Sequence, residues 1–138
     1  MMMPKRVKYR KQQKGVIRGD ATRGNYVAFG DFGLQALDPA RLDARQIEAG
    51  RVAASHYLKG EGRIWIRIFP HKSVTCKPAE VRQGTGKGDI EYWCAPIKTG
   101  TMLFEVGGVP ESVAKAALLR TSHKLPIRCR FVRRRHKI

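Results

Sequence analysis

The stretch whose residues could most readily bind a ligand is Arg82-Gln83-Gly84-Thr85-Gly86-Lys87-Gly88, in which three glycines alternate with polar residues. Glycine tolerates positive φ and lets the backbone approach a partner closely. Strand-like residues precede the stretch at 63–69 and follow it at 90–93, so we expect a sheet to hold a cationic tip. The alternative is a hairpin connection without a partner, because most glycine-rich connections are only connections.

Catalytic and nucleotide-binding patterns are absent from the sequence. Walker A requires glycine at position 81 and serine or threonine at position 88, where this chain has Val81 and Gly88. No nucleophile elbow, H-E-x-x-H motif or calcium loop occurs. The 11 acidic residues are scattered, and nothing around Cys76 supports a cysteine–histidine nucleophile pair. We therefore predict that the protein is not an enzyme.

The cysteines Cys76, Cys94 and Cys129 are widely spaced, odd in number and form no C-x-x-C motif. This pattern favours free thiols and a reducing compartment over a disulfide framework. His71 and Cys76 supply two potential ligands, fewer than a closed zinc site needs. We expect no bound metal and no cofactor.

The charge of the chain indicates the class of its partner. Lys and Arg number 28 against 11 acidic residues in 138, for a net charge of +17. Such self-repulsion is relieved by a polyanion, with nucleic acid the first candidate and an anionic membrane surface the second. No apolar run approaches the roughly 20 residues that span a bilayer, and Pro4-Lys5-Arg6 leaves no room for a signal-peptide core. We expect a nucleic-acid partner and no membrane.

Both ends of the chain are basic. Residues 1–24 lack apolar periodicity, so we predict an extended arm. Phosphates attract its cations and bases can stack on Tyr9; the alternative is a disordered, solvated tail. The predicted RNA-binding residues of the arm are Lys5, Arg6, Lys8, Tyr9, Arg10, Lys11, Lys14 and Arg18. A second basic segment, 133–138, contributes Arg133, Arg134, Arg135 and Lys137.

Two helices and several strands are predicted between these ends. Asp43 and Gln46 form a capping-box pattern that starts a helix ending near residues 59–60. Pro110 and Glu111 suit the start of a second helix, which ends before Leu125. We predict an irregular strand within 26–37, a short strand at 74–77 and a final strand at 127–131. Residues 90–97 and 101–106 are predicted to pair as a hairpin turned by 98–100.

The stretch 63–69 alternates strictly and predicts a strand with two different faces. Ile64, Ile66 and Ile68 form the core face. The opposite face carries Arg63, Trp65, Arg67 and Phe69. Interleaved cations and aromatics are typical of RNA-binding sheets; alternatively, this face is partly buried and its arginines extend to water.

Two motifs resemble a known family. Residues 59–70, Lys-Gly-Glu-Gly-Arg-Ile-Trp-Ile-Arg-Ile-Phe-Pro, and residues 82–88 followed by Trp93 are similar to two signatures of the bacterial large-subunit ribosomal protein L16 family. The resemblance extends in order through 4–6, 44–49, 108–110 and 124–127, so it covers nearly the whole chain. Gly60 replaces a usual cation and Gln83 a usual methionine, which affects local contacts only.

The resemblance implies one α+β domain over 1–138, with two helices packed on a mainly antiparallel, mixed sheet. Its parts would be the arm (1–24), a core (25–132), a basic loop (77–89) and the tail (133–138). It also implies a structural constituent of the large ribosomal subunit, in the cytoplasm or in an organelle. Its partners would be large-subunit rRNA, tRNA near the aminoacyl-tRNA site and peptidyl-transferase region, and neighbouring ribosomal proteins, without homo-oligomers.

In that family the loop points toward the peptidyl-transferase region. The matching positions here are Arg82, Gly84, Gly86, Lys87 and Gly88. Two other classes of function stay open at this point. An RNA-modifying or nucleotide-using enzyme would need a cofactor pocket or a perturbed acid. A free nucleic-acid-binding regulator would need dimer symmetry or a helix-turn-helix.

Overall fold

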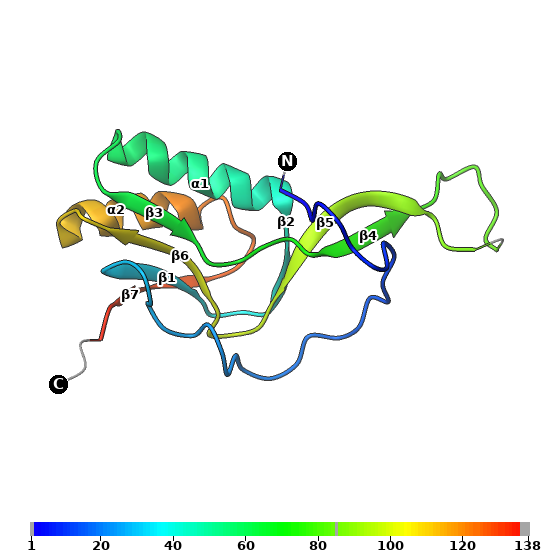
Figure 1. Cartoon of the computed structure of the whole chain (residues 1–138), viewed down its shortest axis with the longest axis horizontal. Coiled ribbons are helices and arrows are strands. Elements are labelled where there is room, and N and C mark those ends of the chain that lie inside the picture. Colours follow the sequence, from blue (N-terminus) through cyan, green and yellow to red (C-terminus); the bar gives the residue numbers. More distant parts are fainter. Residues whose placement is uncertain (1, 85, 136–138) are drawn as a thin grey trace.

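The computed structural model describes residues 2–84 and 86–135 and confirms the α+β class. Figure 1 shows two helices side by side over one sheet, and a long strand pair that extends away from them. The elements are β1 (Phe32–Ala36), β2 (Ala40–Asp43), α1 (Ala44–Leu58), β3 (Arg63–Ile66), β4 (Lys72–Cys76), β5 (Asp89–Ile97), β6 (Met102–Gly107), α2 (Glu111–Ser122) and β7 (Cys129–Arg133). Within the described residues, no helix is long and apolar enough to cross a membrane.

The strands form two sheets. One has the order β3-β6-β1-β7 and the other β2-β5-β4, and every ladder between these strands is antiparallel. The predicted hairpin of 90–97 with 101–106 is therefore wrong, because β5 and β6 belong to different sheets. The turn between them bonds to the end of β1 instead. The Gly100 N–H donates to the Ala36 carbonyl at 2.8 Å, and the Ala36 N–H donates to the Thr101 carbonyl at 2.9 Å.

The core lies between the helices and the four-stranded sheet. All six residues of β6 are buried, and Phe104 is fully enclosed. Ile47 from α1 and Leu118 from α2 are buried in the same cluster, together with Ile97 from β5. One core therefore spans both sheets, and the far ends of β4 and β5 project beyond it (Figure 1).

The first helix begins as its sequence predicts. The Asp43 side chain caps the start of α1, and the Gln46 side chain accepts the Asp43 N–H at 3.0 Å, which completes the capping box. Leu42 and Ile47 on either side of the cap are fully buried. The helix ends at Leu58, followed by Lys59 in the left-handed region with φ 50°.

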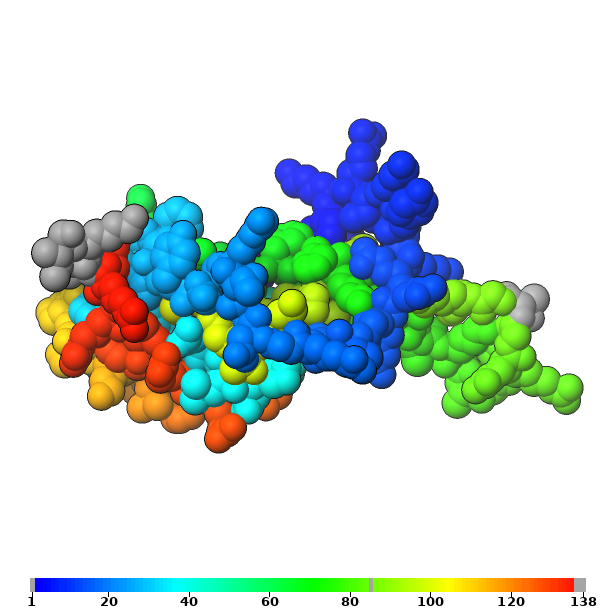
Figure 2. Space-filling model, turned by 90° about the horizontal axis from the view of Figure 1, so that it is seen from below, coloured from blue at the N-terminus to red at the C-terminus, as the bar shows by residue number. Residues whose placement is uncertain are grey.

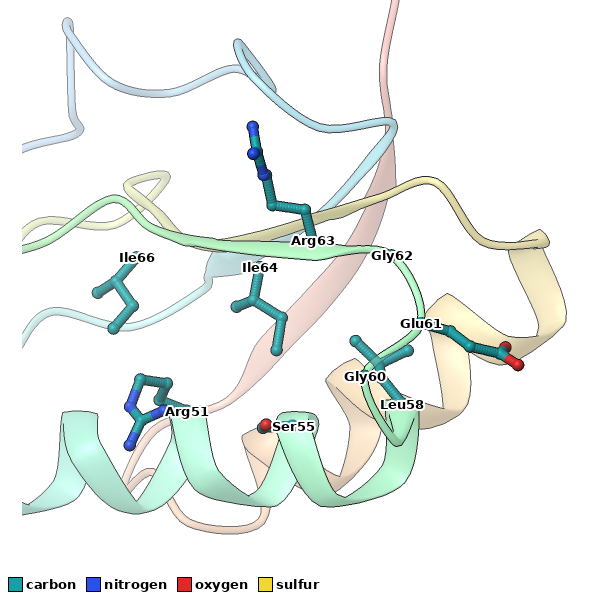
Figure 3. A pocket seen from close by; sticks show the side chains of 9 residues that line it. All are labelled: Arg51, Ser55, Leu58, Gly60, Glu61, Gly62, Arg63, Ile64 and Ile66. Carbon is teal, nitrogen blue, oxygen red and sulfur yellow. The ribbon is translucent and has the colours of Figure 1, made fainter.

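Strand β3 is shorter than predicted, although its two faces are as expected. The strand ends at Ile66, but the Arg67 N–H still bonds the Leu103 carbonyl at 2.9 Å. Figure 3 shows Ile64 and Ile66 pointing toward α1 and Arg63 pointing away from it. A cavity of about 350 Å³ remains between the isoleucines and the helix.

The three cysteines are free thiols in different surroundings. Cys76 is exposed, Cys94 is buried and Cys129 is half-buried. Burial raises the pKa of the Cys94 thiol, and it raises the pKa of Cys129 to about 11. Because the thiolate is the reactive form, these two cysteines are protected from alkylation by both access and protonation.

Asp43→Ala should lower the free energy of unfolding by about 1 kcal/mol, because it removes the side-chain cap of α1. Asp43→Asn is the matched control, since asparagine keeps the capping oxygen and removes only the charge that pairs with Arg45. Urea unfolding of both variants separates the two effects. Equal losses in the two variants would show that the ion pair, and not the cap, stabilises the helix start.

Candidate nucleic-acid interface

The glycine-rich loop is the tip of the β4–β5 hairpin and the part of the molecule farthest from the helices (Figure 1). Its described residues from 78 to 87 are exposed. Gly84 and Gly86 have φ of 114° and 94°, in the region that favours glycine, and only open space surrounds the position where a Cβ would stand. Thr85 lies outside the described residues. The tip thus presents bare backbone beside the exposed side chain of Arg82.

The N-terminal arm packs against the base of this loop. Lys11 Nζ donates to the Lys87 carbonyl at 3.1 Å, and Lys87 Nζ donates in return to the Gln12 carbonyl. These bonds join segments that are about 75 residues apart in the sequence. The arm and the loop, which the sequence analysis treated as separate cationic segments, therefore form one surface.

Further along, the arm follows the edge strand β4 of the three-stranded sheet. The Ser73 hydroxyl donates to the Arg10 carbonyl, and Lys72 Nζ donates to the Lys14 carbonyl. The arm therefore lies along this edge of the sheet from residue 10 to residue 14. Arg41 of β2 then holds the Gly15 carbonyl at 2.8 Å.

A cavity of about 320 Å³ lies where the arm meets the sheet. Its lining includes the cations Lys14, Arg41, Lys72 and Lys87. Figure 2 shows the arm, in dark blue, crossing the middle of the molecule between the body and the projecting loop. Cationic side chains therefore converge on this junction from the arm, β2, β4 and the loop.

The charge of the arm and the loop is not compensated within the described part of the chain. The five ion pairs found there all use arginines of the body: Arg45–Asp43, Arg51–Glu48, Arg67–Glu105, Arg128–Asp38 and Arg133–Glu111. The lysines of the arm and loop bond only to backbone carbonyls, and every arm cation from Lys5 to Arg18 is exposed. A carbonyl bond fixes the position of a cation without cancelling its charge, which stays available to phosphates.

The two arginines of the β3 face are placed differently. Arg63 is exposed, with its guanidinium 5.9 Å from the ring centre of Trp65. Arg67 extends inward, where its side chain is 16% exposed and its Nη1 lies 2.5 Å from Oε2 of Glu105. The face is thus partly buried, as the second alternative supposed, but only Arg63 extends to water, because Arg67 is bound to an internal carboxylate. RNA binding by this face stays a prediction.

Glu105, the buried partner of Arg67, was not identified from the sequence. It is fully buried in β6, and its Oε1 accepts three successive backbone N–H groups, from Ala28, Phe29 and Gly30, at 2.8, 3.0 and 3.1 Å. The indication in the sequence is one carboxylate inside the otherwise apolar run Met102–Gly107. A buried charge needs such partners, so that run already implied a cation and several donors elsewhere in the fold.

The C-terminal basic segment divides into a paired and an exposed part. Arg133 belongs to β7, and its Nε donates to Glu111 at 2.7 Å. Arg134 and Arg135 are exposed beyond the strand. Lys137 lies outside the described residues. Within those residues, no group of three or more His, Cys, Asp or Glu side chains could hold a metal ion.

Comparisons with a family model and with known proteins agree. A family model described as ribosomal protein L16p/L10e matches residues 4–132. The large ribosomal subunit protein uL16 of Heliobacterium modesticaldum is 54% identical over 134 residues, which cover 97% of this chain and 93% of the relative. Residues 4–24 of the arm and the whole loop lie inside the region matched by the family model.

Glu105→Gln should lower the free energy of unfolding by about 3–5 kcal/mol, because it leaves Arg67 unpaired in the interior. The amides of residues 28–30 should lose protection from hydrogen exchange in parallel. Adding Arg67→Met should restore part of the loss, since the unpaired charge is then removed. If Glu105→Gln alone were as stable as the wild type, the role given to this carboxylate would be contradicted.

Proposed function

The chain belongs to the ribosomal protein L16p/L10e family, and on that basis we propose that its arm and loop bind large-subunit rRNA and that the loop tip contacts tRNA near the aminoacyl-tRNA site. Membership of the family makes the protein a structural constituent of the large ribosomal subunit in the cytoplasm, and not an enzyme. Its partners therefore include rRNA and other ribosomal proteins.

The observation that carries the rRNA proposal is the docking of the arm on the loop through carbonyl bonds alone. Each of these bonds fixes a cationic side chain in place without neutralising it. A preformed surface of this kind binds a polyanion with less loss of side-chain entropy than a free tail would. The junction lined by Lys14, Arg41, Lys72 and Lys87 is the part of this surface best suited to an RNA backbone.

The remaining rRNA contacts come from exposed cations elsewhere on the arm, at the start of β3 and beyond the end of β7. They comprise Lys5, Arg6, Lys8, Arg10, Lys11, Arg18, Arg63, Arg134 and Arg135, with Tyr9 as a stacking residue. Arg67 and Arg133 support the interface through their carboxylate partners Glu105 and Glu111. The projecting tip is left for tRNA: Arg82 supplies a charge, and Gly84, Gly86 and Gly88 supply backbone without side chains.

Binding of the protein to large-subunit rRNA should depend strongly on salt. If about six phosphates are contacted, the logarithm of the binding constant should fall with the logarithm of salt concentration at a slope of about −4 to −5. Filter binding across a potassium chloride series measures this slope. A binding constant that does not change with salt would refute the electrostatic account.

Arg82→Ala should leave the fold intact and impair tRNA binding. The residue is exposed, so the free energy of unfolding should change by no more than about 0.5 kcal/mol. Loss of a charged hydrogen bond of about 1.5–3 kcal/mol should slow accommodation of aminoacyl-tRNA on ribosomes carrying the variant. Lys98→Ala, an exposed cation between β5 and β6, is the control.

Normal accommodation by ribosomes that have incorporated Arg82→Ala would show that the loop is only a connection. Lys87 is unsuitable for this test, because its side chain also holds the arm at Gln12.

A further inference from the structure

Two exposed aromatic side chains lie outside the arm and loop, in the segment before β1. Tyr26 is 64% exposed and Phe29 is 59% exposed. We propose that Tyr26 and Phe29 form a stacking site for an unpaired base of the large-subunit rRNA. This proposal rests on the proposed rRNA binding. The cations are proposed to contact phosphates, whereas these two rings would contact a base.

The segment that carries the two rings is held rigidly. Its three amides at residues 28–30 converge on Oε1 of Glu105, and the Val27 side chain between the rings is buried. Gly30 lets the segment lie directly on β6, since a Cβ there would stand 2.7 Å from the Val106 carbonyl oxygen. Rings on a fixed backbone lose little conformational entropy when a base stacks on them.

Arg67 lies against the ring of Phe29 and helps to hold it in place. Its guanidinium lies 5.1 Å from the ring centre of Phe29, and its Nη1 donates to the Tyr26 carbonyl at 3.2 Å. The same guanidinium is paired with Glu105 and largely removed from water. A base on the exposed part of Phe29 would extend this stack of cation and ring, an arrangement that favours nucleobases of any identity.

The surroundings favour RNA over a protein partner. Arg23, three residues before Tyr26, is exposed. The exposed Arg63 lies over the ring of Trp65, and that ring lies close to Gly30. Figure 2 shows the light-blue segment of residues 24–31 on the same face as the dark-blue arm. The segment that carries the two rings therefore lies on the same face as the arm proposed to bind the rRNA backbone, so one rRNA could contact both.

Binding of full-length protein to large-subunit rRNA transcripts tests the site. Phe29→Leu should weaken binding about 5- to 150-fold, the range expected for one stacked base, while Phe29→Tyr should bind as the wild type does. The salt dependence of Phe29→Leu should keep the wild-type slope, because no phosphate contact is lost. Tyr57→Leu is the matched control, since its ring also faces a guanidinium, that of Arg120 at 4.8 Å.

Ultraviolet cross-linking of assembled large subunits tests the same site in place. Trypsin releases residues 24–41 as one peptide, and fragmentation should locate a nucleotide on Tyr26 or Phe29. Wild-type affinity of Phe29→Leu, or a cross-link from this peptide to another protein, would overturn the stacking site and leave the proposed rRNA binding standing. Failure of the wild-type protein to bind rRNA would overturn both.

Discussion

The buried carboxylate of Glu105 is the interaction on which the packing of the segment before β1 against β6 depends. It lies in a strand whose six residues are all buried, where an ionised group is tolerated only with several donors around it. Three backbone amides and the guanidinium of Arg67 provide them. One side chain thereby holds the backbone of residues 28–30 and the Arg67 side chain just after β3.

A second constraint is the repulsion among like charges. A net charge of +17 opposes compaction, yet the arm lies close to other cations of the hairpin and β2. Backbone carbonyls make this possible, because each accepts a hydrogen bond from Lys72, Lys87 or Arg41 without requiring an acidic residue. The resulting surface is ordered and remains strongly positive, and an RNA backbone complements it.

Local patterns predicted much of the fold. The capping box at Asp43 and Gln46 placed the start of α1, and the alternation at 63–69 assigned Ile64 and Ile66 to the side facing the helix, because both depend on residues close in sequence. The pairing of β5 with β6 was predicted wrongly for the converse reason. Strand periodicity identifies a strand and its faces but not its partner, which is chosen by burial across the whole core.

The sequence by itself determined the positive charge, the cationic loop and arm, and the resemblance to a ribosomal family, since these follow from residue types and short-range order. The α+β class was expected only through that resemblance. Only the tertiary structure decided that the arm docks on the loop, that Arg67 extends inward to Glu105, and that Tyr26 and Phe29 remain outside. These contacts join residues about 40 to 80 positions apart. The contacts of Glu105 form because a buried carboxylate must find donors wherever the packed chain places them, whereas the bonds between arm and loop lie on the surface and depend on how the fold brings the two segments together.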